Sequence, residues 1–232
     1  MRIAVIPARG GSKRIPRKNI KVFCGKPMIA WSIEAAKKSQ CFDAVIVSTD
    51  DSEIADIARK YGAEVPFERP KELADDHAPT IPVIKHALEW YESAGKTIEQ
   101  LCCIYATAPF VQTKDITSGL ERLIQEDADY AISITSFPFP IQRALTLSDS
   151  KRLNMFHPEH ALTRSQDLEE AWHDVGQFYW GKASAWKEEK PFFTSDSIGI
   201  QIPRYRAQDI DTEEDWTNAE RLFSLNKKDV IR

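Results

Sequence analysis

Residues 2–21 of the chain read RIAVIPARGGSKRIPRKNIK, a short apolar run that leads into a glycine-containing and strongly basic loop. Residues 3–6 predict a buried strand, because a short apolar run bounded by turn-forming residues is typical of strands covered on both faces. Gly10 and Gly11 allow a tight turn and can bring backbone N–H groups toward a ligand. The stretch therefore predicts a parallel sheet whose first strand ends in an anion-binding loop.

The alternation of strand and helix patterns continues through the first half of the chain. Further strands are expected at residues 44–47, 64–67, 101–105 and 130–135, and helices at residues 27–39, 52–60, 80–94 and 113–125. Pro27 suits a first helical position, Ser52 an N-cap and Gly62 a helix end. Short apolar strands separated by helices predict an α/β, Rossmann-like nucleotide-binding fold with a mostly parallel central sheet. Ligands of such sheets bind beyond the carboxyl ends of the strands.

The rhythm breaks over residues 136–175, which contain the sequence FPFP and a histidine-rich stretch. We expect one domain over residues 1–232, with residues 136–175 inserted as a small arm that meets a partner subunit. The α/β pattern resumes at residues 178–180 and ends in a helix near residues 212–223. Since most soluble oligomers are two-fold symmetric dimers, the expected assembly is a homodimer.

Composition excludes several classes of partner. The chain has 232 residues, 42% apolar and 28% charged, and a net charge of −4, which gives no general attraction to nucleic acid or to anionic lipid. The four cysteines form no CxxC pair and no metal-ligand spacing, which fits a reducing compartment. No signal peptide is visible, and no apolar stretch approaches the roughly 20 residues that span a membrane. A cytoplasmic location, without nucleic-acid or membrane partners, is therefore expected.

Positive charge is concentrated at the start of the chain. Residues 1–33 contain eight Lys or Arg and no Asp or Glu. Six of the eight lie within thirteen residues: Arg9, Lys13, Arg14, Arg17, Lys18 and Lys21. Six like charges repel one another unless an anion neutralises them, and a nucleoside triphosphate with about four negative charges is a suitable one. A solvated basic loop is the alternative, and the spacing matches neither a Walker loop nor a GxGxxG fingerprint.

The basic loop and several later segments together resemble the cytidylyltransferases that activate sialic acids and related nine-carbon 2-keto sugars. The resemblance covers nearly the whole chain. The later segments are ERP at residues 68–70 with LADD at 73–76, RSQD at 164–167, and DID at 209–211. FPFP at residues 137–140 and HDVGQFYW at 173–180 are most similar to the branch of this family that acts on pseudaminic acid.

This resemblance implies that the anomeric hydroxyl of an acidic nine-carbon sugar attacks the α-phosphate of CTP, giving a CMP-sugar and pyrophosphate. Catalysis of such a transfer rests mainly on positioning and charge stabilisation. The catalytic residues that it implies are Arg9, Lys18, Lys21 and Asp211. The substrate-binding residues that it implies are Ala8, Gly10, Gly11, Ser12, Lys13, Arg69, Thr80, Tyr105, Arg164, Gln166 and His173.

Some of these residues also have plain structural interpretations. Arg69 could pair with Glu68 or Glu72 at the surface, and Thr80 could simply begin the following helix. Tyr105 stands where relatives that act on sialic acid have a glutamine that helps to recognise the base, so it is a departure from the family pattern. Tyr105 could equally be an ordinary strand residue.

Further along, Arg164 suits the carboxylate of the sugar, because its guanidinium is a planar bidentate donor. Gln166 and His173 are weaker candidates for contacts with the sugar. A lone histidine such as His173 is just as often a structural hydrogen-bonding residue.

Asp209 and Asp211 alternate in an extended segment, so their side chains are expected on the same side. Two carboxylates suit Mg²⁺, which keeps water ligands and takes phosphate oxygens as others. The resemblance implies the same metal. The alternative is helix capping, since Asp211 or Thr212 could cap the last helix and residues 212–215 resemble a capping box.

Several rival functions remain open. The same transfer could act on N-acetylneuraminic, legionaminic or an eight-carbon acid, and an Asp-x-Asp motif also occurs in sugar transferases. A nucleotide-binding module without chemistry is the rival from another class. The basic loop and the aspartate pair together disfavour it.

Overall fold

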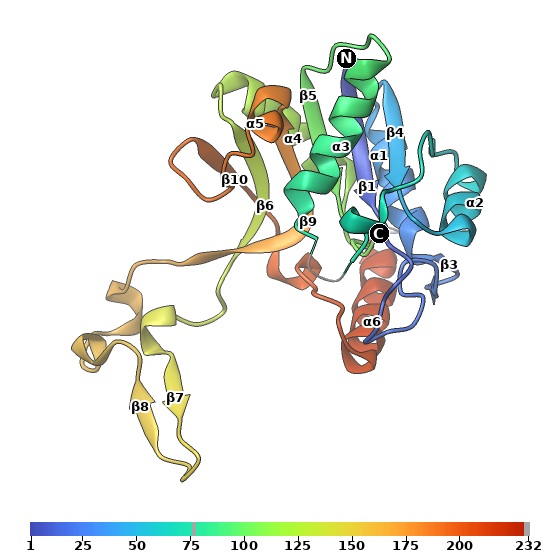
Figure 1. Ribbon diagram of the computed structural model, residues 1–232. Coiled ribbons are helices and arrows are strands. Elements are labelled where there is room, and N and C mark those ends of the chain that lie inside the picture. The colour runs from blue at the N-terminus through green and yellow to red at the C-terminus, as the bar shows by residue number, and fades with distance from the viewer. Residues whose placement is uncertain (76–77, 230–232) are drawn as a thin grey trace.

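The computed structural model describes residues 1–75 and 78–229, and it is built around a six-stranded sheet (Figure 1). The sheet has the strand order β10-β6-β9-β5-β1-β4. Its strands are β1 (Arg2–Pro7), β4 (Ala44–Ser48), β5 (Gln100–Ile104), β6 (Tyr130–Ser136), β9 (Trp172–Lys182) and β10 (Ser197–Gln201). β1 runs parallel to β4 and β5, and β10 parallel to β6, whereas β9 is antiparallel to both of its neighbours. The predicted α/β class with a mostly parallel sheet is confirmed.

Helices cover both faces of this sheet. The α-helices are α1 (Met28–Ser39), α2 (Ser52–Lys60), α3 (Thr80–Ser93), α4 (Thr113–Gln125), α5 (Ala183–Lys187) and α6 (Glu213–Asp229). In β1, Ala4 and Ile6 pack in one core with α1, α2 and α4, while Ile3 and Val5 pack in a second core with α3 and α5. This alternation places apolar side chains on both faces of the strand, which is why the run carries no polar residue.

A third apolar cluster lies beneath the basic loop. Its buried members are Ile15, Phe23, Met28, Phe110, Ile210, Trp216 and Ala219. Phe23 lies in a small hairpin formed by β2 (Val22–Phe23) and β3 (Lys26–Pro27), and its ring makes edge contacts with Trp216 and Phe223 of α6, both at 5.4 Å. The last helix therefore supports the loop that follows the first strand.

Residues 137–171 leave the sheet between β6 and β9 and project away from it (Figure 1). They contain a two-stranded hairpin, β7 (Leu145–Leu147) with β8 (Leu153–Met155). Three short 3₁₀ turns complete the extension: η2 (Ile141–Arg143), η3 (Pro158–His160) and η4 (Ser165–Asp167). We call residues 137–171 the extension below.

Several local predictions need correction. Residues 64–67 form no strand beyond an isolated bridge between Ile46 and Glu64, because Pro66 has no N–H with which to continue the ladder. The N-cap of α2 is Asp51, not Ser52, since the Asp51 carboxylate accepts a hydrogen bond from the N–H of Ile54 at 3.0 Å. Pro27 is the residue before α1 rather than its first residue.

The remaining elements were not expected from the sequence. They include the hairpin β2–β3, α5, β10 and the turns η1 (Lys71–Leu73) and η5 (Arg204–Arg206). The last helix also continues beyond residue 223 to residue 229.

Candidate active site

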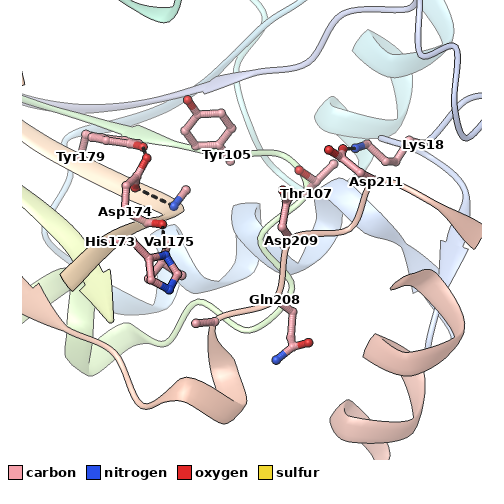
Figure 2. A pocket seen from close by; sticks show the side chains of 12 residues that line it. Lys18, Tyr105, Thr107, His173, Asp174, Val175, Tyr179, Gln208, Asp209 and Asp211 are labelled. Carbon is pink, nitrogen blue, oxygen red and sulfur yellow. Dashed lines mark hydrogen bonds and ion pairs between the residues drawn. The ribbon is translucent and has the colours of Figure 1, made fainter. Parts of the chain in front are cut away.

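A cavity of about 500 Å³ opens at the end of the sheet where strand β5 ends and strand β9 begins (Figure 2). Three chain segments and one side chain from the basic loop form its walls. They contribute Lys18; Tyr105 and Thr107; His173, Asp174, Val175, Gly176 and Tyr179; and Ala207, Gln208, Asp209 and Asp211. The cavity lies beyond the carboxyl end of a parallel strand, where ligands of α/β sheets bind.

Lys18 and Asp211 face each other across one end of this cavity (Figure 2). The Lys18 Nζ donates to Asp211 Oδ1 at 3.1 Å and to the carbonyl of Ile210 at 2.7 Å. A guanidinium nitrogen of Arg14 lies 2.6 Å from the other oxygen of Asp211. The basic loop is therefore joined directly to the segment that carries the predicted metal ligands.

Arg17 fixes the loop to the start of α2. Its guanidinium donates to both oxygens of Asp51, one of them at 2.9 Å, and also to Glu53. The hydrogen bonds from Arg17 lower the pKa of Asp51 to about 2. Arg17 has a positive φ of 57°, so the backbone adopts a left-handed conformation at the same position.

Carboxylates of the chain itself neutralise much of the loop's charge. Besides Arg14, Arg17 and Lys18, Lys21 donates to both oxygens of Glu213 at 2.7 Å. Four of the six cations therefore need no external anion to relieve their repulsion, contrary to our expectation. The side chains of Arg9 and Lys13 also have interactions within the chain.

The backbone at the two glycines is held close to the end of β4. The N–H of Gly10 donates to Asp50 Oδ1 at 3.0 Å, and the N–H of Ala8 donates to the carbonyl of Ser48 at 2.9 Å. A Cβ added at Gly10 would lie 2.7 Å from an oxygen of Asp51, whereas one added at Gly11 would meet nothing within 4 Å. A side chain at position 10 would thus force the Asp51 side chain to shift, which favours glycine at this close approach to α2.

Ser12 is also engaged locally, because its N–H donates to the carbonyl of Gly10 at 3.1 Å. The backbone N–H groups of Ala8, Gly10 and Ser12 are consequently used inside the chain in this conformation. Our expectation that the glycine turn points its donors at a ligand is not met for these three.

Arg69 is buried, with 4% of its surface exposed, so the interpretation as a surface pair with Glu68 or Glu72 is wrong. Its Nε donates to Ser48 Oγ at 3.1 Å, and a second guanidinium nitrogen donates to the Ser48 carbonyl. Burial lowers the pKa of Arg69 to about 10. Arg69 thus places a buried positive charge at the end of β4, beside the basic loop. Of the motif LADD quoted above, Asp76 lies outside the described residues.

Thr80 and Tyr105 form a polar pair at the edge of the cavity. Thr80 begins α3, as its plain interpretation proposed, and its hydroxyl also lies 3.1 Å from the hydroxyl of Tyr105. Tyr105 follows the last residue of β5 and lines the cavity rather than belonging to the strand. Burial raises the pKa of Tyr105 to about 12, so this hydroxyl stays protonated near neutral pH.

Asp209 and Asp211 both line the cavity, and Ile210 between them is buried in the cluster beneath the loop. The capping alternative is resolved by a reciprocal pair: the hydroxyl of Thr212 accepts from the N–H of Asp215 at 3.2 Å, and Asp215 accepts from the N–H of Thr212 at 2.8 Å. Capping therefore occupies Thr212 and Asp215 and leaves the carboxylate of Asp211 facing the cavity.

The opposite wall contains residues that the sequence analysis did not assign. Asp174 accepts from the N–H of Gly176 at 2.8 Å and from the hydroxyl of Tyr179, and burial raises the pKa of Tyr179 (Figure 2). Thr107 and Gln208 line the cavity as well. Asp174, Gly176 and Tyr179 lie inside the motif HDVGQFYW, which supported the family resemblance but yielded only His173 as a site residue.

The structure separates the three residues expected on the sugar side. His173 lines the cavity, its Nδ1 lies 2.9 Å from the carbonyl of Asp174, and its ring contacts Phe137 at 4.7 Å. Arg164 and Gln166 belong to the extension and do not line the cavity of their own chain. The exposed guanidinium of Arg164 is paired with Asp167, at 2.7 Å for the shorter contact.

Comparison with known proteins identifies the type of protein that carries this site. Residues 3–228 match the family model described as cytidylyltransferase. The chain belongs to the cytidylyltransferase family. It is 44% identical over 229 residues to a pseudaminic acid cytidylyltransferase of Campylobacter jejuni, with 99% of each chain covered. It is 32% identical over 236 residues to a CMP-N,N'-diacetyllegionaminic acid synthase of Legionella pneumophila, again with 99% of each covered.

Solved structures agree on the fold of this cytidylyltransferase. A CMP:2-keto-3-deoxy-manno-octonic acid synthetase complexed with CTP superposes with a TM-score of 0.69 over 97% of this chain and 99% of the other, at 16% identity. At that identity the likeness concerns the fold alone.

Proposed function

We propose that this cytidylyltransferase transfers CMP from CTP to the anomeric hydroxyl of pseudaminic acid, giving CMP-pseudaminic acid and pyrophosphate. The observation that carries the proposal is the 44% identity to the Campylobacter jejuni enzyme over 99% of both chains. The cavity supports it, because one cation of the loop after β1, Lys18, and the carboxylates of Asp209 and Asp211 border the same space.

In this transfer the anomeric oxygen forms a bond to the α-phosphorus and its proton is released to water, while the bond from that phosphorus to the bridging oxygen of pyrophosphate breaks. Negative charge grows on the leaving pyrophosphate, so placed cations stabilise the transition state. We assign Arg9 and Lys13 to the phosphates. Lys18 lies at the cavity wall, and we assign it, with Lys21, to balancing the charge of the α-phosphate and pyrophosphate.

The donor set fits Mg²⁺ held by Asp209 and Asp211. Burial and the neighbouring charge of Asp211 raise the pKa of Asp209, which indicates two carboxylates close enough to repel each other. A divalent cation relieves that repulsion, and hard carboxylate oxygens are ligands that Mg²⁺ accepts. When bound, the ion supplies compensation for the charge of the triphosphate. Meanwhile Lys18 and Arg14 hold Asp211 in place.

The acidic sugar is assigned to the opposite wall, with His173 beside it. Arg164 and Gln166 are proposed to meet the sugar from the extension, and Tyr105 with Thr80 to lie against the nucleotide.

We further propose a homodimer, because the extension exposes apolar side chains such as Phe139, 79% exposed, and Leu162, 97% exposed. No helix in the described part of the chain is long and apolar enough to cross a membrane. We propose a cytoplasmic enzyme without nucleic-acid or membrane partners. Light scattering at micromolar protein concentration tests the dimer, and a monomeric mass would refute it.

A pyrophosphate-release assay tests the function. Purified protein is incubated with CTP, Mg²⁺ and, in separate reactions, pseudaminic, N,N'-diacetyllegionaminic and N-acetylneuraminic acid. We expect the highest kcat/KM with pseudaminic acid and a product mass equal to its CMP conjugate. Higher turnover of either rival sugar would reassign the substrate, and CTP binding without pyrophosphate release from any of them would leave only a nucleotide-binding module.

A substitution tests the metal assignment within the same assay. Asp211→Ala is expected to abolish Mg²⁺-dependent release, while Asp56→Ala, an exposed carboxylate on α2, keeps wild-type turnover. Normal activity of the Asp211 variant would remove this residue from the metal site.

A further inference from the structure

The chain segments that form the three walls of the cavity are joined by one buried residue, Arg206. Arg206 ends the turn η5, three residues before Asp209, and only 2% of its surface is exposed. It donates to both oxygens of Asp115, with the second contact at 3.2 Å, in a pair whose side chains are 2% and 9% exposed. Asp115 lies in the first turn of α4.

Arg206 also contacts the other two walls. One of its guanidinium nitrogens lies 3.5 Å from the carbonyl of Phe110, in the chain that runs from Tyr105 and Thr107 to α4. The carbonyl of Arg206 accepts a hydrogen bond from the side chain of buried Gln177 in β9 at 2.6 Å. One residue thus joins the segments that end β5, begin β9 and carry the aspartate pair.

The backbone after Arg206 is held at both ends. At the far end Ile210 is buried beneath the loop, and its carbonyl accepts from Lys18. At the near end the ion pair and the Gln177 contact fix Arg206. Between these two anchors the chain has only residues 207–209, so the direction of Arg206 sets where the Asp209 carboxylate lies.

A contribution to stability does not by itself explain the buried ion pair between Arg206 and Asp115. A buried ion pair loses its hydration, and an apolar pair of similar volume is often as stable or more so. Arg206 Nε is buried and has no hydrogen-bond partner among the described residues, so the pair is not even fully satisfied. The planar, bidentate contact with Asp115 instead fixes orientation, which an apolar contact does not.

We infer that Arg206, through its ion pair with Asp115, is a positioning residue that sets the geometry of the Asp209 and Asp211 carboxylates. The inference rests on the proposed function, because it assigns a purpose to the aspartate pair. It acts through backbone placement, since neither Arg206 nor Asp115 lines the cavity.

The experiment replaces the pair by an apolar one, in the double variant Arg206→Met with Asp115→Leu. The matched control is Arg122→Met with Glu126→Leu, an Arg–carboxylate pair at the other end of α4 that is about 40% exposed. For each protein we measure the melting temperature, hydrogen exchange of the peptide spanning residues 203–212, and the Mg²⁺ concentration that half-saturates pyrophosphate release.

We expect the double variant to melt within a few degrees of the parent, because the apolar pair replaces a costly buried one. Exchange in residues 203–212 should be faster by about tenfold, since the near anchor is lost. The half-saturating Mg²⁺ concentration should rise by about tenfold or more, as when residues that orient the ligands of a metal are removed. Replacing the control pair should change neither the exchange of residues 203–212 nor the half-saturating Mg²⁺ concentration.

A folded double variant with parental exchange and parental Mg²⁺ dependence would overturn the inference. If the double variant does not fold, Arg206→Lys supplies the same test, because lysine keeps the positive charge and loses the bidentate contact with Asp115. Parental exchange and parental Mg²⁺ dependence in that variant would also overturn the inference. Exchange does not depend on turnover. Failure of the proposed function would therefore appear as absent pyrophosphate release in the parent, and failure of this inference as unchanged exchange.

Discussion

Substituting Asp51 by asparagine tests how firmly the basic loop is fixed to α2. Asparagine caps a helix about as well as aspartate, so Asp51→Asn keeps the acceptor for the Ile54 N–H and removes the charge that faces Arg17. The effect of this change therefore isolates the ionic contact between the loop and the helix.

The magnitude follows from the pKa of Asp51, which is lowered from an ordinary 3.8 to about 2, first by the hydrogen bonds from Arg17 and then by the backbone N–H groups of Ile54 and Glu53. A difference of this size corresponds to about 2.4 kcal/mol at one pKa unit per 1.36 kcal/mol. The Arg17 side chain is 38% exposed, so solvent screening reduces the expected loss to about 1–2 kcal/mol.

The direction in which this stabilisation changes with pH also follows from the pKa of Asp51. The folded pKa is depressed, so the contribution is present above the unfolded pKa near 4 and disappears as pH falls through about 2. The difference in unfolding free energy between parent and Asp51→Asn should be full at pH 7, about half as large at pH 3, and close to zero near pH 1.

Urea unfolding followed by tryptophan fluorescence, at matched protein concentration, measures this difference. Asp56→Asn is the control on the same helix, since its pair with Arg59 is 78% and 54% exposed and should contribute little. A loss below about 0.5 kcal/mol at pH 7, or one that does not change between pH 7 and 3, would refute the reasoning.

Three shorter predictions concern the basic loop, the cavity and the core. Gly10→Ala should weaken CTP binding by about tenfold in calorimetry, because the added Cβ would lie 2.7 Å from an oxygen of Asp51. Gly11→Ala is the control and should change the affinity little, since a Cβ there meets nothing within 4 Å. Equal effects of the two substitutions would contradict a role for the close approach at Gly10. Tyr105→Phe removes the hydroxyl that contacts the first residue of α3 and should raise the KM for CTP by several-fold with little change in kcat, so an unaltered KM would exclude this hydroxyl from nucleotide binding. Cys103, fully buried and with its pKa raised by burial, should resist iodoacetamide at pH 8 in the native protein and react after unfolding, and rapid native labelling would contradict its burial.

The sequence predicted those parts of the fold that depend on local pattern. The apolar run before Ala8 and the helical periods of α3 and α4 are local signals, and each matches an observed element. The direction of β9 had no such signal, since the apolar residues 178–180 suit either orientation. The pairing is decided by residues 36 to 82 positions away, from the pair of Ser136 with Trp172 to that of Gln100 with Lys182.

The same distinction applies to the site. Asp209, Asp211 and Tyr105 stand in recognisable motifs, and all three line the cavity. The partners of the loop cations were not foreseeable, because Asp51 lies 34 positions from Arg17 and Asp211 lies 193 positions from Lys18. The contribution of Asp174 depends on β9 running against its neighbours, so it could not be inferred before that direction was known.

Because β9 is reversed, the chain departs and returns at the same rim: Ser136 at the end of β6 is paired with Trp172 at the start of β9 (Figure 1). Residues 137–171 are thus inserted at the end of the sheet where His173 and Asp174 line the cavity, the wall to which we assign the sugar. Exchanging them for the corresponding segment of a legionaminic acid relative would change this rim, while residues 8–21, which follow β1, keep their contacts with α2 and residues 210–213. The architecture therefore lets the segment beside the proposed acceptor site vary independently of the basic loop.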